Sequence, residues 1–166
     1  MSAALTLLLL AALAAPPDTA DPATASCISC KVAVHTNGWC DRHAVGYVAA
    51  VPIRSALLYE VMDAHGHELD LPNLTCPTCR KAVDTDGYCE LDRIGFAHRM
   101  AYFSYLTWAQ AKGEPRTPEE IKCPVCRRHA ARRGWCDTCK VGMLGPVAIR
   151  DKTLWQRAAR AAEILE

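Results

Sequence analysis

The stretch CPTCRKAVDTDGYCELDRIGF (residues 76–96) contains three cysteines and, three residues after the last of them, an aspartate. Two other segments align with it without a gap: CISCKVAVHTNGWCDRHAVGY (27–47) and CPVCRRHAARRGWCDTCKVGM (123–143). In each copy the third cysteine follows the second by ten residues and is preceded by a glycine and an aromatic residue. Self-similarity at a fixed period indicates a structural unit used repeatedly. The chain of 166 residues is therefore predicted to contain three related small units.

The position three residues after the third cysteine differs between the copies. It is His43, Asp92 or Cys139. A disulfide framework needs cysteines in pairs, and two of the copies hold only three cysteines. Histidine, aspartate and cysteine share the ability to bind zinc, so substitution within this set is typical of a ligand position.

Three zinc sites are therefore predicted, the middle one weaker than the other two because carboxylate ligation beside three thiolates is uncommon. Their ligand sets are Cys27, Cys30, Cys40 and His43; Cys76, Cys79, Cys89 and Asp92; and Cys123, Cys126, Cys136 and Cys139.

Between the two ligand pairs of each copy lies a turn signal. Asn37-Gly38 and Asp86-Gly87 are typical two-residue turns of β-hairpins, and Arg133-Gly134 is a less favourable version. We expect a hairpin at this point to fold the chain back, so that the second ligand pair meets the first.

The spacing and the aromatic-Cys pair resemble the zinc-ribbon family, specifically the short tandem ribbons found in many bacterial proteins. The resemblance covers about 20 residues per copy. It implies a small metal-bound β-hairpin in each copy. The chain departs from the family after the second cysteine, where Lys31, Arg80 and Arg127 replace the usual glycine.

Each copy is followed by a stretch with helical periodicity: residues 53–66, 100–113 and 150–165. In the first, Leu57, Leu58, Val61 and Met62 form the expected apolar face, and Asp151 is the expected cap of the last. We predict a small α+β fold of three repeats, each a metal-bound hairpin plus an amphipathic helix, at 26–72, 73–119 and 120–166. Units this small need a structural metal, because they cannot bury an adequate core alone.

The N-terminus, residues 1–25, is predicted to be a signal peptide and linker. ALTLLLLAALAA (4–15) is a continuous apolar run, too short to span a bilayer comfortably, and a Pro/Ala-rich polar stretch follows it. The run lacks a preceding Lys or Arg, so a membrane-associating or buried N-terminal helix stays open as an alternative. We expect an exported protein, periplasmic or secreted, or one anchored by this segment if it is uncleaved.

Other residues admit two interpretations each. Asp92 is a fourth ligand, or it leaves an open position of the kind that catalytic zinc uses or that a degenerate site shows. His65 and His67, among acidic residues, form a surface metal site or, as we expect, a solvated helix end.

The third copy contains a group of arginines at residues 127, 128, 132 and 133. They could bind nucleic acid, or, as we expect, balance the negative charge of thiolate-bound zinc. The C-x2-C pairs also occur in thiol–disulfide enzymes, where the reactive thiol opens a helix in a βαβ frame. We expect no such frame here, because a hairpin is predicted to follow every pair.

These features predict an exported zinc-binding repeat protein that acts as a binding or metal-handling module, without catalytic residues or other cofactors. Its partner would be a protein or a metal donor or acceptor, and nucleic acid is not expected. Two alternatives are an enzyme that uses the C-x2-C pairs or the middle zinc, and an intracellular zinc-ribbon adaptor for nucleic acid or protein.

Overall fold

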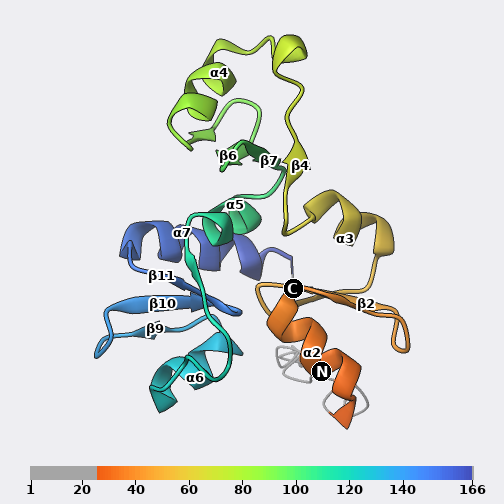
Figure 1. Ribbon diagram of the computed structural model, residues 1–166, viewed down its shortest axis with the longest axis vertical. Coiled ribbons are helices and arrows are strands. Elements are labelled where there is room, and N and C mark those ends of the chain that lie inside the picture. Colours follow the sequence, from red (N-terminus) through yellow and green to blue (C-terminus); the bar gives the residue numbers. More distant parts are fainter. Residues whose placement is uncertain (1–25, 166) are drawn as a thin grey trace, which may run out of the picture.

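The computed structural model describes residues 26–165, so the predicted signal peptide lies outside the described residues. The chain forms three units of the same construction: a helix that begins at the first C-x2-C pair, three short antiparallel strands, and a second helix. Figure 1 shows α4, β6 and β7 of the middle unit at one end of the molecule, with the first and third units side by side at the other. The predicted small α+β fold of three repeats is confirmed.

The elements of the first unit are α2 (Ile28–Thr36), β1 (Trp39–Cys40), β2 (Val45–Val48), β3 (Val51–Ile53) and α3 (Ala56–Met62). Those of the second are β4 (His67–Glu68), the 3-10 helix η1 (Leu71–Asn73), α4 (Pro77–Asp84), β5 (Tyr88–Cys89), β6 (Ile94–Ala97), β7 (Met100–Tyr102) and α5 (Tyr105–Ala111). Those of the third are β8 (Glu114–Pro115), α6 (Pro124–Ala130), β9 (Trp135–Cys136), β10 (Val141–Leu144), β11 (Val147–Ile149) and α7 (Lys152–Glu163).

Each unit has its own antiparallel sheet. The strand orders are β1-β2-β3, β4-β7-β6-β5 and β8-β11-β10-β9. The extra strands β4 and β8 come from the linkers before the second and third C-x2-C pairs, ahead of residues 73 and 120. The linkers are therefore part of the sheets, and the second and third units each receive an edge strand from the chain that leads into them.

The hairpin turns predicted at Asn37-Gly38 and Asp86-Gly87 are wrong. Asn37 (φ 52°) is instead the C-cap of α2, and Asp86 (φ 49°) lies two residues beyond the end of α4; the next N–H in each case, from Gly38 or Gly87, bonds back to the helix at 2.8 or 2.7 Å. Left-handed residues followed by glycine serve helix C-termini as readily as hairpins, so this dipeptide alone does not distinguish the two. The third copy does the same with Arg133 (φ 52°).

The two-residue hairpin turns instead occur one strand later in each unit: between β2 and β3, between β6 and β7, and between β10 and β11. The turn residues Ala49 and Ala50 have φ values of 51° and 63°, and His98 and Arg99 have 51° and 65°. Two positive φ values in a row are typical of the type I′ turn, which suits the twist of a two-residue hairpin. None of these residues is the asparagine or glycine that usually marks such a turn, which is why the sequence did not reveal it.

The three closing helices are shorter than predicted and differ in burial. Residues 100–102 form strand β7, so α5 begins only after the Ser104 cap. In α3 the expected apolar face is wrong, because Leu57 and Val61 are 72% and 47% exposed while Met62 is buried. Helix α7 is confirmed, with the Asp151 carboxylate accepting the N–H groups of residues 153 and 154.

One hydrophobic core joins all three units. Helix α5 of the middle unit lies at its centre, and five consecutive residues of this helix, 106–110, are buried. Figure 1 shows α5 lying over α7, between the sheets of the first and third units. The buried members of this shared core are Val48, Ala49, Val51, Ile53, Met62, Leu106, Ala109, Leu144, Val147, Ile149, Ala158 and Ala162.

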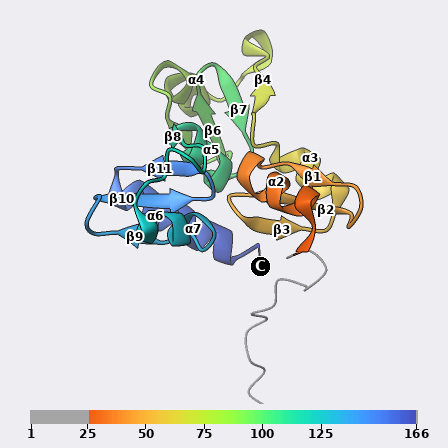
Figure 2. The same cartoon turned by 60° about the horizontal axis from the view of Figure 1, so that its bottom comes forward.

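A turn-to-turn contact closes this core between the first and third units. Gly145 has a φ of 59°, and a Cβ built on it would lie 3.1 Å from the Ala49 backbone. The first unit's hairpin turn therefore packs directly against that of the third, and Figure 2 shows these two units side by side from below. A side chain at residue 145 would be strained in backbone conformation and crowded at once.

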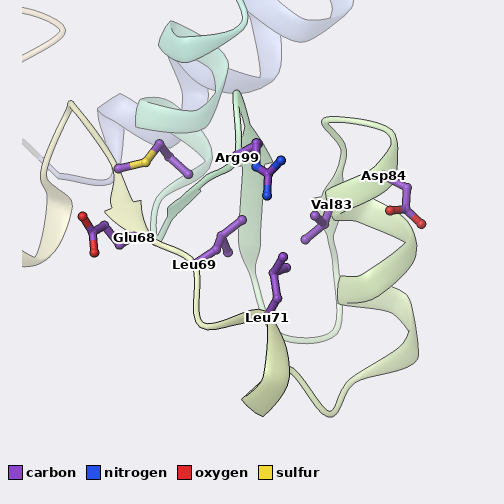
Figure 3. A pocket seen from close by; sticks show the side chains of 7 residues that line it. Glu68, Leu69, Leu71, Val83, Asp84 and Arg99 are labelled. Atoms are coloured by element: carbon purple, nitrogen blue, oxygen red, sulfur yellow. The ribbon is translucent and has the colours of Figure 1, made fainter.

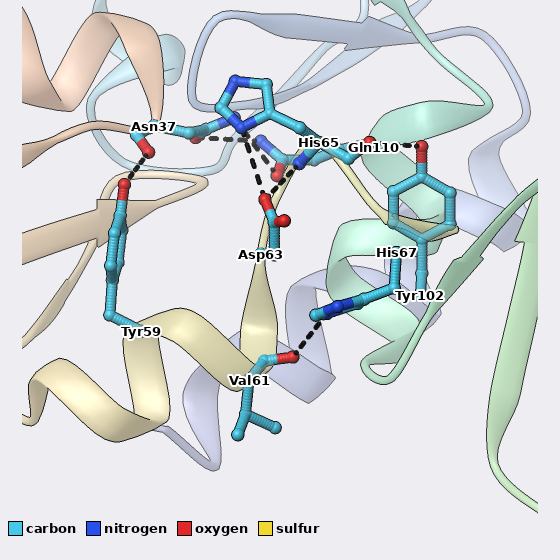
Figure 4. A network of polar contacts seen from close by, with 8 residues as sticks. All are labelled: Asn37, Tyr59, Val61, Asp63, His65, His67, Tyr102 and Gln110. Atoms are coloured by element: carbon cyan, nitrogen blue, oxygen red, sulfur yellow. Dashed lines mark hydrogen bonds and ion pairs between the residues drawn. The ribbon is translucent and has the colours of Figure 1, made fainter. Parts of the chain in front are cut away.

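A buried amide connects the three units by hydrogen bonds. Gln110 of α5 is 4% exposed, and its Nε2 donates to the Leu144 carbonyl at 3.0 Å and to Asn37 Oδ1 at 3.4 Å. Asn37 Oδ1 also accepts the Ala49 N–H at 2.9 Å, and Tyr59 donates to the Asn37 carbonyl at 2.7 Å. Figure 4 shows this network at the point where α2, α3 and α5 meet. The residue that ends the first metal-bearing helix is thereby tied to the common core.

Candidate metal centres

The structure brings all twelve predicted ligands together in three groups of four. Within each group the candidate ligand atoms lie within 4.8 Å of one another. The first two ligands stand at the N-terminus of the C-x2-C helix, and the other two stand on the turn between the first and second strands of the sheet. We call this turn the ligand turn (residues 40–43, 89–92 and 136–139).

The donor sets fit a tetrahedral zinc ion. With a Zn–S bond of about 2.3 Å, a tetrahedral ion separates a sulfur from a nitrogen or oxygen ligand by about 3.6 Å. His43 Nδ1 lies 3.2 Å from Cys30 Sγ and 3.7 Å from Cys40 Sγ. Asp92 Oδ2 lies 3.0 Å from Cys79 Sγ and 3.8 Å from Cys89 Sγ. These separations bracket the expected value, and thiolate and imidazole are the ligands that zinc prefers in structural sites.

The first cysteine of the first group is activated by its place at a helix N-terminus. Cys27 is the N-cap of α2, and the backbone N–H of Cys30 donates to its sulfur, which lowers the pKa of the Cys27 thiol to about 6 against the effect of burial. Burial raises the pKa of the Cys30 thiol to about 11, and its neighbours Cys40 and Cys27 raise it further. Within this pair, the Cys27 thiol therefore ionises readily. The Cys30 thiol would ionise only if a nearby cation, such as a bound metal ion, stabilised its negative charge.

The other two groups repeat this asymmetry in part. The backbone N–H of Cys126 lowers the pKa of Cys123 to about 7, and burial raises the pKa of Cys126 itself. In the middle group burial raises the pKa of Cys79. Burial also opposes ionisation of Cys89, but the backbone N–H groups of the ligand turn outweigh it and its pKa is lowered. The folded backbone thus favours thiolate at selected positions.

The basic residue after the second cysteine has a structural role that the sequence did not reveal. The Arg80 side chain donates to the Leu74 carbonyl at 2.7 Å, and that of Arg127 donates to the Ile121 carbonyl at 3.0 Å. Both carbonyls lie two residues before the first cysteine of their copy. Each arginine therefore fixes the chain that enters the C-x2-C helix, in addition to supplying positive charge near the thiolates.

The three groups differ in how far solvent reaches the fourth ligand. In the first group the three cysteines are buried and His43 is half-buried. In the other two the second and third ligands are buried, while Asp92 and Cys139 are exposed. The middle group combines an exposed fourth position with the weakest donor type, a carboxylate.

Each ligand turn is supported by an aromatic pair that the sequence analysis missed. The residue before the third cysteine packs on an aromatic ring of the closing helix, with centroids 5.3 Å apart for Trp39 and Tyr59 and 5.4 Å for Trp135 and Trp155. In the middle unit Tyr88 and Trp108 are likewise 5.3 Å apart.

The same helix ring covers the glycine of the second strand. A Cβ on Gly46, Gly95 or Gly142 would lie 2.2, 2.1 or 2.1 Å from it. The spacing from glycine to ring is thirteen residues in all three copies, and this would have been the signal in the sequence.

The histidines of the acidic stretch do not converge. His65 Nδ1 contacts Asp63 Oδ1 at 3.3 Å, whereas His67 Nε2 faces the Val61 carbonyl at 3.2 Å and its ring lies against Phe103. Figure 4 shows the two imidazoles engaged with different partners. Within residues 26–165 they belong to no group of metal-ligating side chains.

A surface cavity of about 490 Å³ lies on the middle unit. Figure 3 shows its apolar floor, formed by Leu69, Leu71 and Val83, with Arg99 and the carboxylate of Asp84 near its rim. None of the predicted ligands lines it. Its lining residues Leu69 and Val83 also pack against the cluster that buries Cys79 and Cys89, so the cavity lies beside the middle ligand group without including its ligands.

Comparison with protein-family models, curated proteins and solved structures returned no match. Among the helices of residues 26–165, none has the length and apolar character needed to cross a membrane. What the chain does must therefore be argued from its own geometry.

Proposed function

We propose that this protein is an exported zinc-binding module in which three zinc ions hold the repeats in shape for interaction with a partner or for metal handling. The observation that carries the proposal is the convergence of three four-residue ligand sets, each at the junction of a helix N-terminus and a ligand turn. Export is supported by the apolar run at 4–15 and is tested by fractionation with N-terminal sequencing.

A structural role for the metal is supported by what the small cores contain. In the first unit, Cys27, Cys30 and Cys40 make up half of a buried cluster whose other members are Ala33, Val45 and Tyr47. The middle and third units also bury ligand cysteines among a few apolar side chains. Clusters of this size contribute too little burial alone, so binding of zinc to the folded state supplies the remaining stability.

The test is metal analysis of the purified protein together with thiol counting. Two zinc ions should resist a mild chelator, while the third, from the middle group, is removed first. Replacement of the second cysteine in each copy (Cys30→Ser, Cys79→Ser or Cys126→Ser) should each remove about one zinc per chain. Metal-free protein with five disulfides would overturn the proposal.

A second candidate is thiol–disulfide exchange, and one observation favours it. The expectation that a hairpin directly follows each C-x2-C pair is wrong: the first pair of each copy opens a helix, and the pKa of the first cysteine is about 6 at Cys27 and about 7 at Cys123. Such an arrangement suits a nucleophilic thiol. We expect zinc to occupy these sulfurs, so an insulin-reduction assay should be blank for the zinc-loaded protein. Turnover that Cys27→Ser or Cys123→Ser abolishes would favour the enzyme.

A further inference from the structure

We propose that zinc in the middle group exchanges its Asp92 oxygen for a thiolate brought by another molecule, so that this site captures thiol-bearing ligands. The inference rests on the zinc binding proposed above. Four features of the middle unit carry it: the donor set, the exposure of Asp92, the anchoring of the ligand turn, and the side chains that flank Asp92.

The donor set favours exchange at one position only. Sulfur ligands suit zinc better than a carboxylate when three thiolates are already present. Exchange breaks the Zn–O bond and forms a Zn–S bond, and the proton of the incoming thiol passes to solvent or to the released carboxylate. No electrons are transferred. In the third unit Cys139 already supplies the fourth sulfur, and in the first unit the fourth position holds the imidazole nitrogen of the half-buried His43.

Access and rigidity are both present. Asp92 is exposed, while Cys79 and Cys89 are 1% and 0% exposed, so an incoming ligand reaches the fourth position without displacing the buried sulfurs. The backbone of the ligand turn is held independently of the carboxylate, because its N–H groups donate to the Cys89 sulfur and Arg157 of α7 binds Glu90 at 2.6 Å. The ligand turn is thus held by contacts other than those of the Asp92 carboxylate, and it would keep its place when that carboxylate leaves the metal.

The residues that flank Asp92 suggest which thiols bind. Leu91 is 76% exposed at the tip of the turn, and Arg93 is exposed on the other side. The equivalent tip positions in the other copies are Arg42 and Thr138, neither of them apolar. An apolar contact beside the metal and a guanidinium for a carboxylate favour a cysteine with an apolar neighbour and a nearby acidic group, whether in a peptide or in a small thiol.

The experiment uses the full chain loaded with ¹¹³Cd, whose NMR resonance depends on the number of sulfur ligands. Three resonances are expected, and the all-cysteine third site gives the reference position for four sulfurs. Titration with 2-mercaptoethanol, or with a short peptide of sequence Leu-Cys-Glu, should move only the middle resonance towards that reference, in a saturable manner. Asp92→Cys should place the resonance there without added thiol and abolish the response.

The two thiols separate the sources of the ligand. Leu91→Ser should weaken peptide binding about tenfold through the lost apolar contact and leave the response to 2-mercaptoethanol unchanged. Equal effects on both probes would restrict the site to small thiols and overturn the role of Leu91.

Three outcomes would overturn the exchange itself: a middle resonance that does not respond, one that disappears because thiol extracts the metal, or a middle group that takes up no cadmium while the others do. Failure of all three groups to bind metal would instead refute the proposed zinc binding.

Discussion

The buried amide of Gln110 offers a direct test of whether the three units form one cooperative structure. Its Nε2 donates to the Leu144 carbonyl of the third unit and to Asn37 of the first, and the side chain is 4% exposed. Gln110→Met keeps the volume and shape of the side chain but removes its polar atoms. The buried Leu144 carbonyl then loses its side-chain donor, and the half-buried Asn37 loses a partner.

An unsatisfied buried polar group costs about 1–3 kcal/mol, and Asn37 retains the Ala49 N–H, so the two losses together should be roughly 2–4 kcal/mol. For a chain of this size that corresponds to a fall in Tm of about 5–15 °C. Urea unfolding of zinc-loaded protein, followed by tryptophan fluorescence and by circular dichroism, measures the change. Gln156→Met on the exposed face of α7 is the matched control and should stay within about 0.5 kcal/mol of the parent.

Two results would refute this reasoning. If Gln110→Met is as stable as Gln156→Met, the hydrogen bonds of Gln110 contribute nothing. If the parent unfolds in separate transitions by the two probes, the shared core does not make the units cooperative.

Three further predictions concern single contacts. Gly95→Ala places a methyl group 2.1 Å from an indole carbon of Trp108 and should lower the free energy of unfolding, measured by urea unfolding, by about 1–3 kcal/mol. An effect near zero would mean that the indole ring moves freely. Asp92→Ala should leave Tm nearly unchanged at constant zinc, because water replaces a weak ligand, whereas Cys139→Ala should lower it markedly; equal losses would make Asp92 a full structural ligand. Arg157→Ala should cost about 1 kcal/mol at pH 7, and the difference should shrink as the pH falls through the pKa of Glu90, which Arg157 lowers, since the carboxylate that stabilises the fold is then protonated and only the contact of the guanidinium with the Tyr105 ring remains; a difference independent of pH would assign the effect to that ring contact alone.

The ligand groups were predictable because metal chemistry constrains residue type directly. Only Cys, His and Asp alternate at residues 43, 92 and 139, and no packing requirement produces that set. The position of the hairpins was not predictable, because Asn37 and Asp86 have side chains that tolerate positive φ in a helix end or in a turn alike. Whether these residues form a helix end or a hairpin turn depends on whether the C-x2-C segment before them is helical. That segment is short and weakly periodic, so its sequence does not indicate a helix.

Which face of each closing helix is buried depends on tertiary contacts, and the hydrophobic periodicity of the sequence does not predict these contacts. Of the four residues predicted to form the buried face of α3, the structure buries Met62 and exposes residues 57, 58 and 61. Tyr59 also turns inward, where it covers Gly46. The thirteen-residue interval from glycine to aromatic ring is common to all three copies and shows which side of each helix faces its sheet. Comparison of the copies over their full length, rather than over the cysteines alone, reveals it.

The weakest ligand set lies where loss of metal does least harm to the core. The ligand turn of the middle unit is anchored to the shared structure, since Tyr88 packs 4.8 Å from Tyr105 and Arg157 lies 4.2 Å from the Tyr105 ring. Helix α4, which carries the first ligand pair, packs mainly on β5 and β6 of its own unit, and Figure 1 shows it at the far end of the molecule. Zinc bound by the middle group would therefore attach a peripheral helix to a fixed turn. Loss of the metal would loosen α4 while the core built around α5 stays intact, whereas exchange of the Asp92 oxygen alone would keep α4 attached through Cys76 and Cys79, as reversible capture requires.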